Sequence, residues 1–247
     1  MCTLEKRGSL FILTLTGESD QDQEHRLSPS VISAVRSALA EVRSQAVDGS
    51  ALVTLSQGKF FSNGFDLKHA QAVGARAGSA EAAKAELRRM VDLFRGVVAD
   101  LLSLPMPTVA AVTGHAAAAG LLLAMSHDYV MMTSSRGVMY MSELDIGMTL
   151  PDYFTALIRG KIGSAAARRD LVLTAAKVRA TAAVEMGIVE SAHDSAEEVV
   201  DAAMRRAEEL GKRRWSGKAY AGIRKALYPE VCGMLGLKDD VVLPTKL

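Results

Sequence analysis

TVAAVTGHAAAAGLLLAM, residues 108–125, is the stretch from which the fold of this chain is best predicted. Its β-branched start, Thr108–Val112, predicts a buried strand, and Gly114 predicts a turn. The alanine-rich remainder ends in an apolar run at Met125 and predicts a buried helix. A ligand can approach alanine backbone closely, and the first N–H groups of a helix have no partner within it. Two interpretations stay open: a turn that offers an N–H to a ligand oxygen, and a core helix that needs small residues for packing.

Composition indicates an ordinary globular protein. The 247 residues allow one large domain, or one domain with a helical extension. Hydrophobic residues make up 49% and charged residues 23%, which excludes a disordered chain. The net charge of +1 gives no electrostatic reason to expect nucleic acid or an anionic membrane as partner. The two cysteines have neither metal-site nor disulfide-framework spacing, so a reducing compartment is expected.

The two ends of the chain bear on its location. The apolar run near the N-terminus is too short for a signal peptide or a spanning helix. The C-terminus ends in Thr245, Lys246 and Leu247, which is similar to the peroxisomal S-K-L address with threonine in place of serine. We therefore expect a peroxisomal protein with the import receptor as a partner, and otherwise a cytoplasmic one.

Hydrophobic periodicity predicts an α/β fold without a domain linker. Strands are expected at residues 9–16, 51–55, 108–112, 128–133 and 138–141. Helices are expected from Ser28-Pro29 to near Gly49, and over residues 80–103, 115–125, 151–159, 164–174, 180–186, 195–210 and 215–228. The glycines and small residues of 73–79 predict a mobile loop. Strands thus dominate the first 145 residues and helices the last 100.

Several common sites are excluded by their missing motifs. Gly114 and Gly120 are not followed by the Lys-Ser/Thr of a phosphate-binding loop, and no GxGxxG or GxSxG is present. The five histidines form no HxxxH or HExxH pair, so no metal site is expected.

A recurring strand–turn–helix pattern suggests a different chemistry. It occurs at 51–68 and again at 108–125, and two such turns can bring two backbone N–H groups together as an oxyanion hole. A nearby carboxylate would complete a site for removing a proton beside a carbonyl. Glu143 is the first candidate because apolar neighbours on both sides, including Leu144 and Ile146, should desolvate it and raise its pKa. Asp145 is the second candidate if the chain is extended there, and an ion-paired surface glutamate is the alternative for Glu143.

Three segments together resemble the signature blocks of the crotonase, or enoyl-CoA hydratase/isomerase, superfamily. They are FSNGFDL (Phe61–Leu67), GHAAAAGLLLAMSHDYV (Gly114–Val130) and MSELDIGM (Met141–Met148). Their order and spacing agree with the family over roughly residues 8–190. In detail, SHDYV and ELDIGMTLPDYF are similar to plant-type peroxisomal Δ3,Δ2-enoyl-CoA isomerases. Each block alone is a weak signal, whereas three in order make a strong one.

The resemblance implies both a fold and a site. The fold is a crotonase-type spiral of ββα units over 1–190, followed over 191–247 by a helical region that forms a trimer and carries the targeting tail. The oxyanion N–H donors fall on Phe65 and Ala119, and the catalytic carboxylate falls on Glu143. The positions implied to contact an acyl-CoA thioester are Ser62, Asn63, Gly64, Asp66, Leu67, Lys68, Gly120 and Leu122. CoA enters as part of the substrate, so no separate cofactor is implied.

Leu122 distinguishes between the reactions of the family. Hydratases of the family position water with two glutamates, and the first of these matches Leu122, while the second matches Glu143. One carboxylate is enough to move a proton from C2 to C4, whereas water addition needs both. We therefore expect a shift of 3-enoyl-CoA to trans-2-enoyl-CoA in fatty-acid β-oxidation. An enoyl-CoA hydratase and a non-catalytic acyl-CoA-binding protein remain as alternatives.

Overall fold

The computed structural model describes residues 1–17 and 23–238, so the C-terminal Thr245, Lys246 and Leu247 lie outside the described residues. Its strands are β1 (Cys2–Arg7), β2 (Leu10–Leu15), β3 (Ala51–Ser56), β4 (Phe60–Ser62), β5 (Thr108–Val112), β6 (His115–Ala117), β7 (Tyr129–Thr133), β8 (Val138–Tyr140), β9 (Val178–Arg179) and β10 (Ser191–His193). Its helices are α1 (Pro29–Ser44), α2 (Leu67–Ala77), α3 (Ala80–Leu102), α4 (Ala119–Met125), the 3₁₀ turn η1 (Leu144–Ile146), α5 (Asp152–Lys161), α6 (Ala165–Leu173), α7 (Ala180–Glu185), α8 (Ala196–Lys212), α9 (Gly217–Leu227) and α10 (Pro229–Met234).

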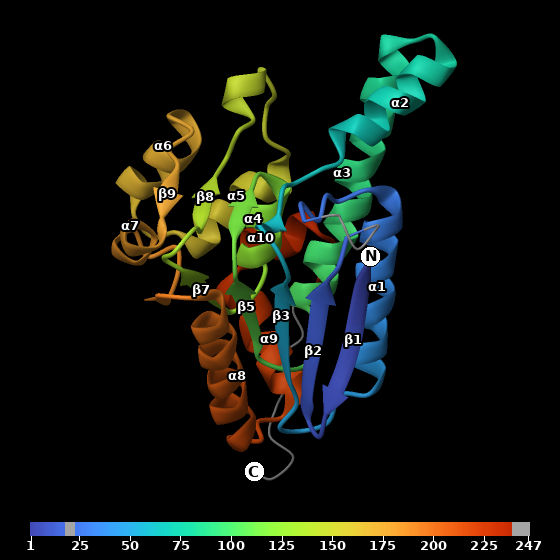
Figure 1. Cartoon of the computed structure of the whole chain (residues 1–247). Helices are drawn as coiled ribbons and strands as arrows, with labels where there is room; N and C mark the ends of the chain where they lie inside the picture. Colours follow the sequence, from blue (N-terminus) through green and yellow to red (C-terminus); the bar gives the residue numbers. More distant parts are fainter. Residues whose placement is uncertain (18–22, 239–247) are drawn as a thin grey trace.

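The described strands form two sheets (Figure 1). The larger sheet has the order β1-β2-β3-β5-β7-β10, in which only the β1–β2 pair is antiparallel. The smaller sheet has the order β4-β6-β8-β9, in which β4, β6 and β8 run parallel. The expected α/β architecture is confirmed.

Three successive ββα turns connect the two sheets. Each turn places its first strand (β3, β5 or β7) in the larger sheet and its second strand (β4, β6 or β8) in the smaller one, and a helix follows. Because the second strands are parallel neighbours, the three segments that follow them leave the same edge of the smaller sheet. This repeated turn is the spiral that the resemblance implies.

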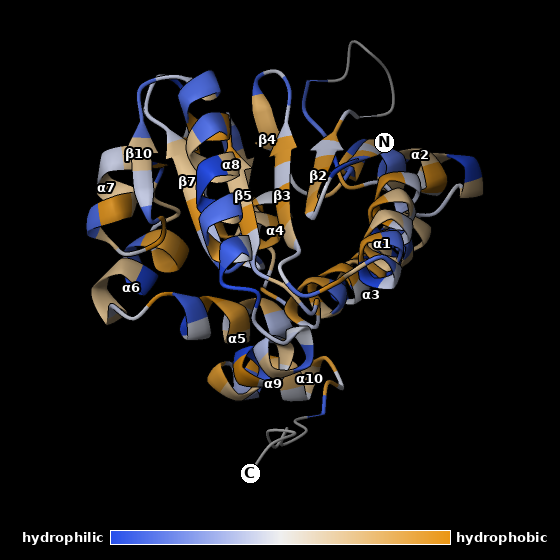
Figure 2. Cartoon of the chain, turned by 90° about the horizontal axis from the view of Figure 1, so that it is seen from below, coloured by the Kyte–Doolittle hydropathy of each residue, from blue (hydrophilic) through white to orange (hydrophobic). Residues whose placement is uncertain are grey.

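The inner strands of the larger sheet, β2, β3, β5 and β7, are buried on both faces, which is typical of parallel sheets. In β2, Phe11 and Leu13 belong to the main core together with side chains of α1 and α3. The alternate residues Leu10 and Ile12 face a second cluster that includes residues of α8. Figure 2 shows α8 over β5 and β7, with a largely hydrophilic outer surface. No helix in residues 1–17 and 23–238 is long and apolar enough to span a membrane.

The expected helix over 115–125 is wrong in its first part. Residues 115–117 form strand β6, and the helix begins only at Ala119. Ala116 and Ala117 pair with Met139 and Tyr140 of β8, so the ladder of a sheet partner outweighs the helical preference of alanine. The first expected helix also ends at Ser44, earlier than predicted, and a turn spans Val47–Ser50.

The expected mobile loop at 73–79 is also wrong. Most of it belongs to α2, which ends at Ala77 and is capped by Gly78 in the left-handed conformation. Gly74 packs so closely on α3 that an added Cβ would lie 2.6 Å from that of Ala83. The small residues that suggested a loop therefore serve a tight helix–helix contact. The short strands β4, β9 and β10 and helix α10 were not predicted either.

Candidate active site

The first candidate turn follows β4. Gly64 has φ +71°, a conformation that favours glycine, and its carbonyl accepts a hydrogen bond from Leu27 N–H at 2.8 Å. Asp66 caps α2 by accepting the His69 N–H at 3.0 Å, so its side chain stabilises the start of that helix. In the described residues the N–H of Phe65 has no backbone acceptor.

The second candidate turn follows β6. Ala118 adopts φ 51° and ψ −124°, which is strained for a residue with a side chain. Its carbonyl accepts the N–H groups of Leu121 and Leu122 at 3.0 and 3.2 Å. The N–H of Ala119, the first residue of α4, likewise has no backbone acceptor within the described chain, as expected for a helix start.

The two turns are in direct contact. A Cβ atom placed on Gly64 would lie 3.4 Å from the Ala119 nitrogen and 3.1 Å from the Ala117 carbonyl oxygen. A Cβ atom on Gly120 would lie only 2.2 Å from the carbonyl oxygen of Ser62. Both glycines are therefore required for the close approach that brings the segments of Phe65 and Ala119 together.

Glu143 follows β8, the third strand along the same edge. The Ala118 N–H donates to the Tyr140 carbonyl at 2.9 Å, so the chain that leaves β8 runs beside the Ala118–Gly120 turn. The Glu143 carbonyl accepts Ile146 and Met148 N–H groups at 3.2 and 2.8 Å, which fixes this loop. Phe65, Ala119 and Glu143 thus each lie two or three residues beyond one of three adjacent parallel strands.

The Glu143 carboxyl group is buried without a charged partner. The residue is 8% exposed, and its Oε2 is a buried oxygen without a hydrogen-bond partner in the described structure. Burial raises the pKa of Glu143 above its ordinary value, and hydrogen bonds from backbone groups of Glu143 and Ser142 lower it by less. Such a carboxylate is suited to act as a base near neutral pH.

The cause of this burial differs in part from the expectation. Met139 and Met141 are buried as expected, but Leu144 and Ile146 are 56% and 54% exposed and do not cover the carboxyl group. Asp145 lies exposed in η1, and this segment is not extended, so the condition for its role as second candidate is not met.

The remaining candidate positions have different surroundings. Ser62 is fully buried, and its hydroxyl donates to the His25 carbonyl at 2.8 Å. Leu122 is also fully buried, within α4. Asn63 and Leu67 are half-buried, and Lys68 is exposed. In residues 1–17 and 23–238 no group of three His, Cys, Asp or Glu residues is arranged to hold a metal ion.

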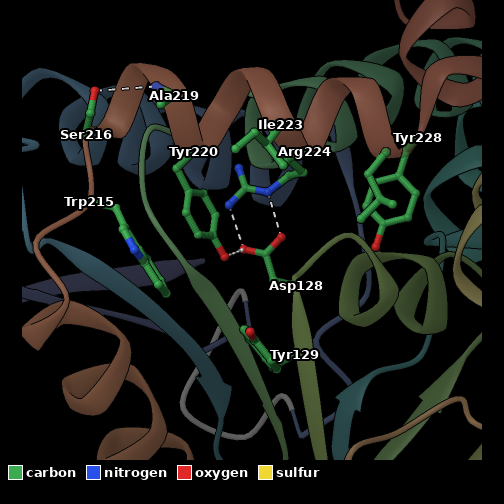
Figure 3. Close-up of a pocket in the computed structure, with 10 residues that line it drawn as sticks. Asp128, Tyr129, Trp215, Ser216, Ala219, Tyr220, Ile223, Arg224 and Tyr228 are labelled. Atoms are coloured by element: carbon green, nitrogen blue, oxygen red, sulfur yellow. Dashed lines mark hydrogen bonds and ion pairs between the residues drawn. The ribbon is translucent and has the colours of Figure 1, made fainter. Parts of the chain in front are cut away.

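A second, largely buried carboxylate lies elsewhere, at the hollow shown in Figure 3. Arg224 of α9 donates to both oxygens of Asp128 at 2.6 Å, and the Tyr220 hydroxyl donates to Oδ2 at 3.2 Å. This cavity of about 440 Å³ is lined by Asp128, Tyr129, Trp215, Ser216, Ala219, Tyr220, Ile223, Arg224, Leu227 and Tyr228. This pair could not be predicted from the sequence, because its members are 96 residues apart and lie on no shared motif.

Two backbone donors and an unpaired carboxylate at one strand edge define a class of site suited to removing a proton beside a carbonyl. The chain belongs to the enoyl-CoA hydratase/isomerase family, whose sequence model matches residues 20–228. This confirms the resemblance stated from the sequence.

Known proteins similar to this chain agree with that family. A relative from Arabidopsis thaliana, "Enoyl-CoA delta isomerase 2, peroxisomal", is 56% identical and covers 100% of both chains. A second Arabidopsis relative, "Enoyl-CoA delta isomerase 3", is 54% identical over 96% of each. A solved structure of a probable enoyl-CoA hydratase from Mycobacterium tuberculosis has a TM-score of 0.80 at 22% identity, covering 95% of this chain and 91% of that one. That similarity supports the fold.

Proposed function

We propose that this protein is an enoyl-CoA delta isomerase, which shifts the double bond of a 3-enoyl-CoA to give the trans-2-enoyl-CoA. The observation that carries the proposal is the unpaired, buried Glu143 on the same strand edge as the unbonded N–H groups of Phe65 and Ala119. The names of the Arabidopsis relatives support the same reaction.

In the proposed mechanism Glu143 takes the proton from C2 of the thioester. The electron pair of that C–H bond moves toward the carbonyl, whose oxygen becomes an enolate oxygen held by the Phe65 and Ala119 N–H groups. As the enolate collapses, the C2=C3 double bond forms and the electron pair of the C3=C4 π bond takes the proton that Glu143 returns to C4, so no atom is gained or lost. Each backbone donor is expected to lower the barrier by about 3 kcal/mol.

Leu122 supports isomerisation over hydration. Its apolar side chain is fully buried, and the family resemblance matches it to the first of the two glutamates with which hydratases position water. An apolar wall there would keep water from the enolate until the proton returns to C4. Leu122→Glu should slow isomerisation, and unchanged kinetics of the folded variant would remove Leu122 from the site.

Substrate binding is proposed to use the first turn and the start of α4. In this proposal Ser62, Asn63, Gly64, Asp66, Leu67, Lys68, Gly120 and Leu122 line the path of the acyl-CoA thioester. Gly64 and Gly120 serve it indirectly by allowing the two turns to meet. In this proposal Lys68, which is exposed, meets the charged CoA end of the substrate.

The proposal extends to the compartment in which the protein works and to its oligomeric state. Two Arabidopsis relatives are named as peroxisomal, and Thr245-Lys246-Leu247 supports import by the receptor for that C-terminal address. Residues 191–247 are proposed as the region that forms a trimer, supported by the exposed apolar side chains of Trp215, Ile223 and Leu227. Sedimentation of the purified chain tests the trimer, and a monomer would contradict it.

Product analysis tests the reaction itself. The purified chain is incubated separately with cis- and trans-3-enoyl-CoA of several chain lengths and with trans-2-enoyl-CoA. We expect trans-2-enoyl-CoA from the 3-enoyl substrates and no 3-hydroxyacyl-CoA from any of them. Rapid formation of 3-hydroxyacyl-CoA would identify a hydratase, and binding without conversion would identify an acyl-CoA-binding protein.

A further inference from the structure

The side chain of Phe65 is held between two helices. Its ring meets that of Phe94 of α3 edge to face, with centroids 5.7 Å apart, and stacks on Phe154 of α5 at 6.3 Å. Phe94 and Phe154 are themselves edge to face at 6.0 Å and are at most 1% exposed. The three rings form one aromatic cluster, while the Phe65 backbone faces the second turn.

The backbone around Phe65 is also held by hydrogen bonds to Leu27. The Gly64 carbonyl, which shares a peptide unit with the Phe65 N–H, accepts the Leu27 N–H at 2.8 Å, and the Asp66 N–H donates to the Leu27 carbonyl at 3.4 Å. The Phe65 N–H cannot be tied to a protein acceptor if it is to bind a substrate oxygen. The bridge to Leu27 holds this peptide unit from the backbone side, and the packed ring holds it from the side-chain side.

The same cluster is joined to the loop of Glu143. That loop leads directly into α5, where Tyr153 precedes Phe154 and packs edge to face on it at 4.9 Å. The Tyr153 hydroxyl donates to the Val91 carbonyl of α3 at 2.8 Å, which fixes α5 on α3. Phe154 thus contacts the ring of Phe65, and it also belongs to the helix into which the Glu143 loop leads.

We propose that Phe154 is a positioning residue that, through the ring of Phe65, sets the Phe65 N–H relative to Glu143. The inference rests on the proposed function, because it concerns the same oxyanion hole. Phe154 touches no reacting atom, so its loss should lower turnover without weakening the binding of the CoA thioester. A displaced donor stabilises the enolate less, and displacements of about 1 Å lower rates by up to about 100-fold.

Phe154→Leu and a matched control, Phe11→Leu, test the proposal. Both rings are at most 1% exposed, but Phe11 lies in β2 and makes no ring contact with Phe65. We expect a similar loss of thermal stability in both. Only Phe154→Leu should lower kcat, by about tenfold, with KM for the 3-enoyl-CoA unchanged. Equal kcat values for the two variants would overturn the proposal.

A double-mutant cycle identifies the route of the effect. If Phe154 acts through the Phe65 ring, Phe154→Leu should change kcat little in a Phe65→Leu background, which keeps the backbone N–H. Independent, multiplicative effects would overturn the proposal. A wild-type protein that converts no 3-enoyl-CoA would instead refute the proposed function, so the two failures are distinguishable.

Discussion

Glu143 is a buried carboxylate and Asp128 a largely buried one, and their surroundings are opposite. Asp128 accepts two hydrogen bonds from the Arg224 guanidinium and further ones from Thr108 and Tyr220. Burial alone raises the pKa of Asp128, but the charges of Arg224 and Lys161 and the hydrogen bonds from Arg224 and the Thr108 N–H outweigh it and leave that pKa lowered. Glu143 has a buried oxygen without a partner, and burial leaves its pKa raised.

The difference separates a structural carboxylate from a reactive one. A paired and fully hydrogen-bonded carboxylate holds its protein neighbours in place and has no reason to take up a proton. An unpaired one is poised to gain a proton from a substrate. Asp128 thus anchors α9 to the start of β5 and β7, while Glu143 is available for chemistry. Substitutions around Asp128 and around Glu143 test whether the first carboxylate is structural and the second is reactive.

The largest effect is expected from breaking the structural pair. Arg224→Met leaves Asp128 buried without its cation, so the free energy of unfolding should fall by about 3–5 kcal/mol. Denaturant titration measures it. The exposed Arg159–Glu230 pair supplies the control, because Arg159→Met should cost at most about 1 kcal/mol. Equal effects of the two substitutions would show that burial of the pair is unimportant.

The next effect concerns the contact between the two turns. Gly120→Ala would place a Cβ 2.2 Å from the Ser62 carbonyl oxygen and must displace α4 with its Ala119 N–H. We expect kcat to fall by about 10²–10³, as for the loss of one oxyanion donor. Gly233→Ala, where an added Cβ meets nothing within 4 Å, is the control. Unchanged turnover of folded Gly120→Ala would exclude Ala119 as a donor.

The two carboxylates should give stability opposite dependences on pH. Glu143 has a raised pKa when folded, so its contribution to stability falls as pH rises from its unfolded to its folded pKa. Asp128 has a lowered pKa, so its contribution is lost as pH falls through that value. Each unit of pKa shift corresponds to about 1.4 kcal/mol. The free energy of unfolding of Glu143→Gln, relative to wild type, should therefore increase as pH rises across the acid range. The same difference for Asp128→Asn should decrease. Denaturant titration at several pH values measures both.

The raised pKa of Glu143 also predicts the pH profile of turnover. The base must be ionised, so kcat/KM should fall as pH drops through a value above that of an ordinary glutamate. A profile that is flat down to pH values near about 4.3, the ordinary glutamate pKa, would contradict the raised value.

The smallest effect is expected at Asp145, close to Glu143 in the chain but exposed in η1. Asp145→Asn should change kcat by less than roughly twofold and leave stability within about 0.5 kcal/mol. A large loss of turnover would transfer the role of base from Glu143 to Asp145.

Much of the fold could be predicted from local sequence because β-branched runs and amphipathic periods mark most elements. Thr108–Val112 and α3 are examples, and both are present. The strand at residues 115–117 could not be predicted, since its conformation depends on pairing with β8, which follows later in the chain. For the same reason the second part of α2, from residue 73 onward, was mistaken for a loop, because Gly74 is explained only by its contact with Ala83.

The candidate site shows the same limit of local information. Three motifs predicted Phe65, Ala119 and Glu143 as site residues. That these residues follow neighbouring strands of one sheet is known only from the order of β4, β6 and β8 in the structure. Burial of Glu143 was predicted from neighbours that prove to be exposed at Leu144 and Ile146. Phe94 lies in no motif, and the ELDIGMTLPDYF segment that ends at Phe154 does not indicate its neighbours, so their contact with Phe65 is visible only in three dimensions.

The most direct measurement is the turnover of Glu143→Gln beside Asp128→Asn on a 3-enoyl-CoA, at a temperature where circular dichroism shows both to be folded. We predict that Glu143→Gln loses about 10²–10⁴ in kcat, as expected for a missing general base. Folded Asp128→Asn should retain turnover within about threefold, because its carboxylate is structural. Near wild-type turnover by Glu143→Gln would contradict the assignment of Glu143 as the base.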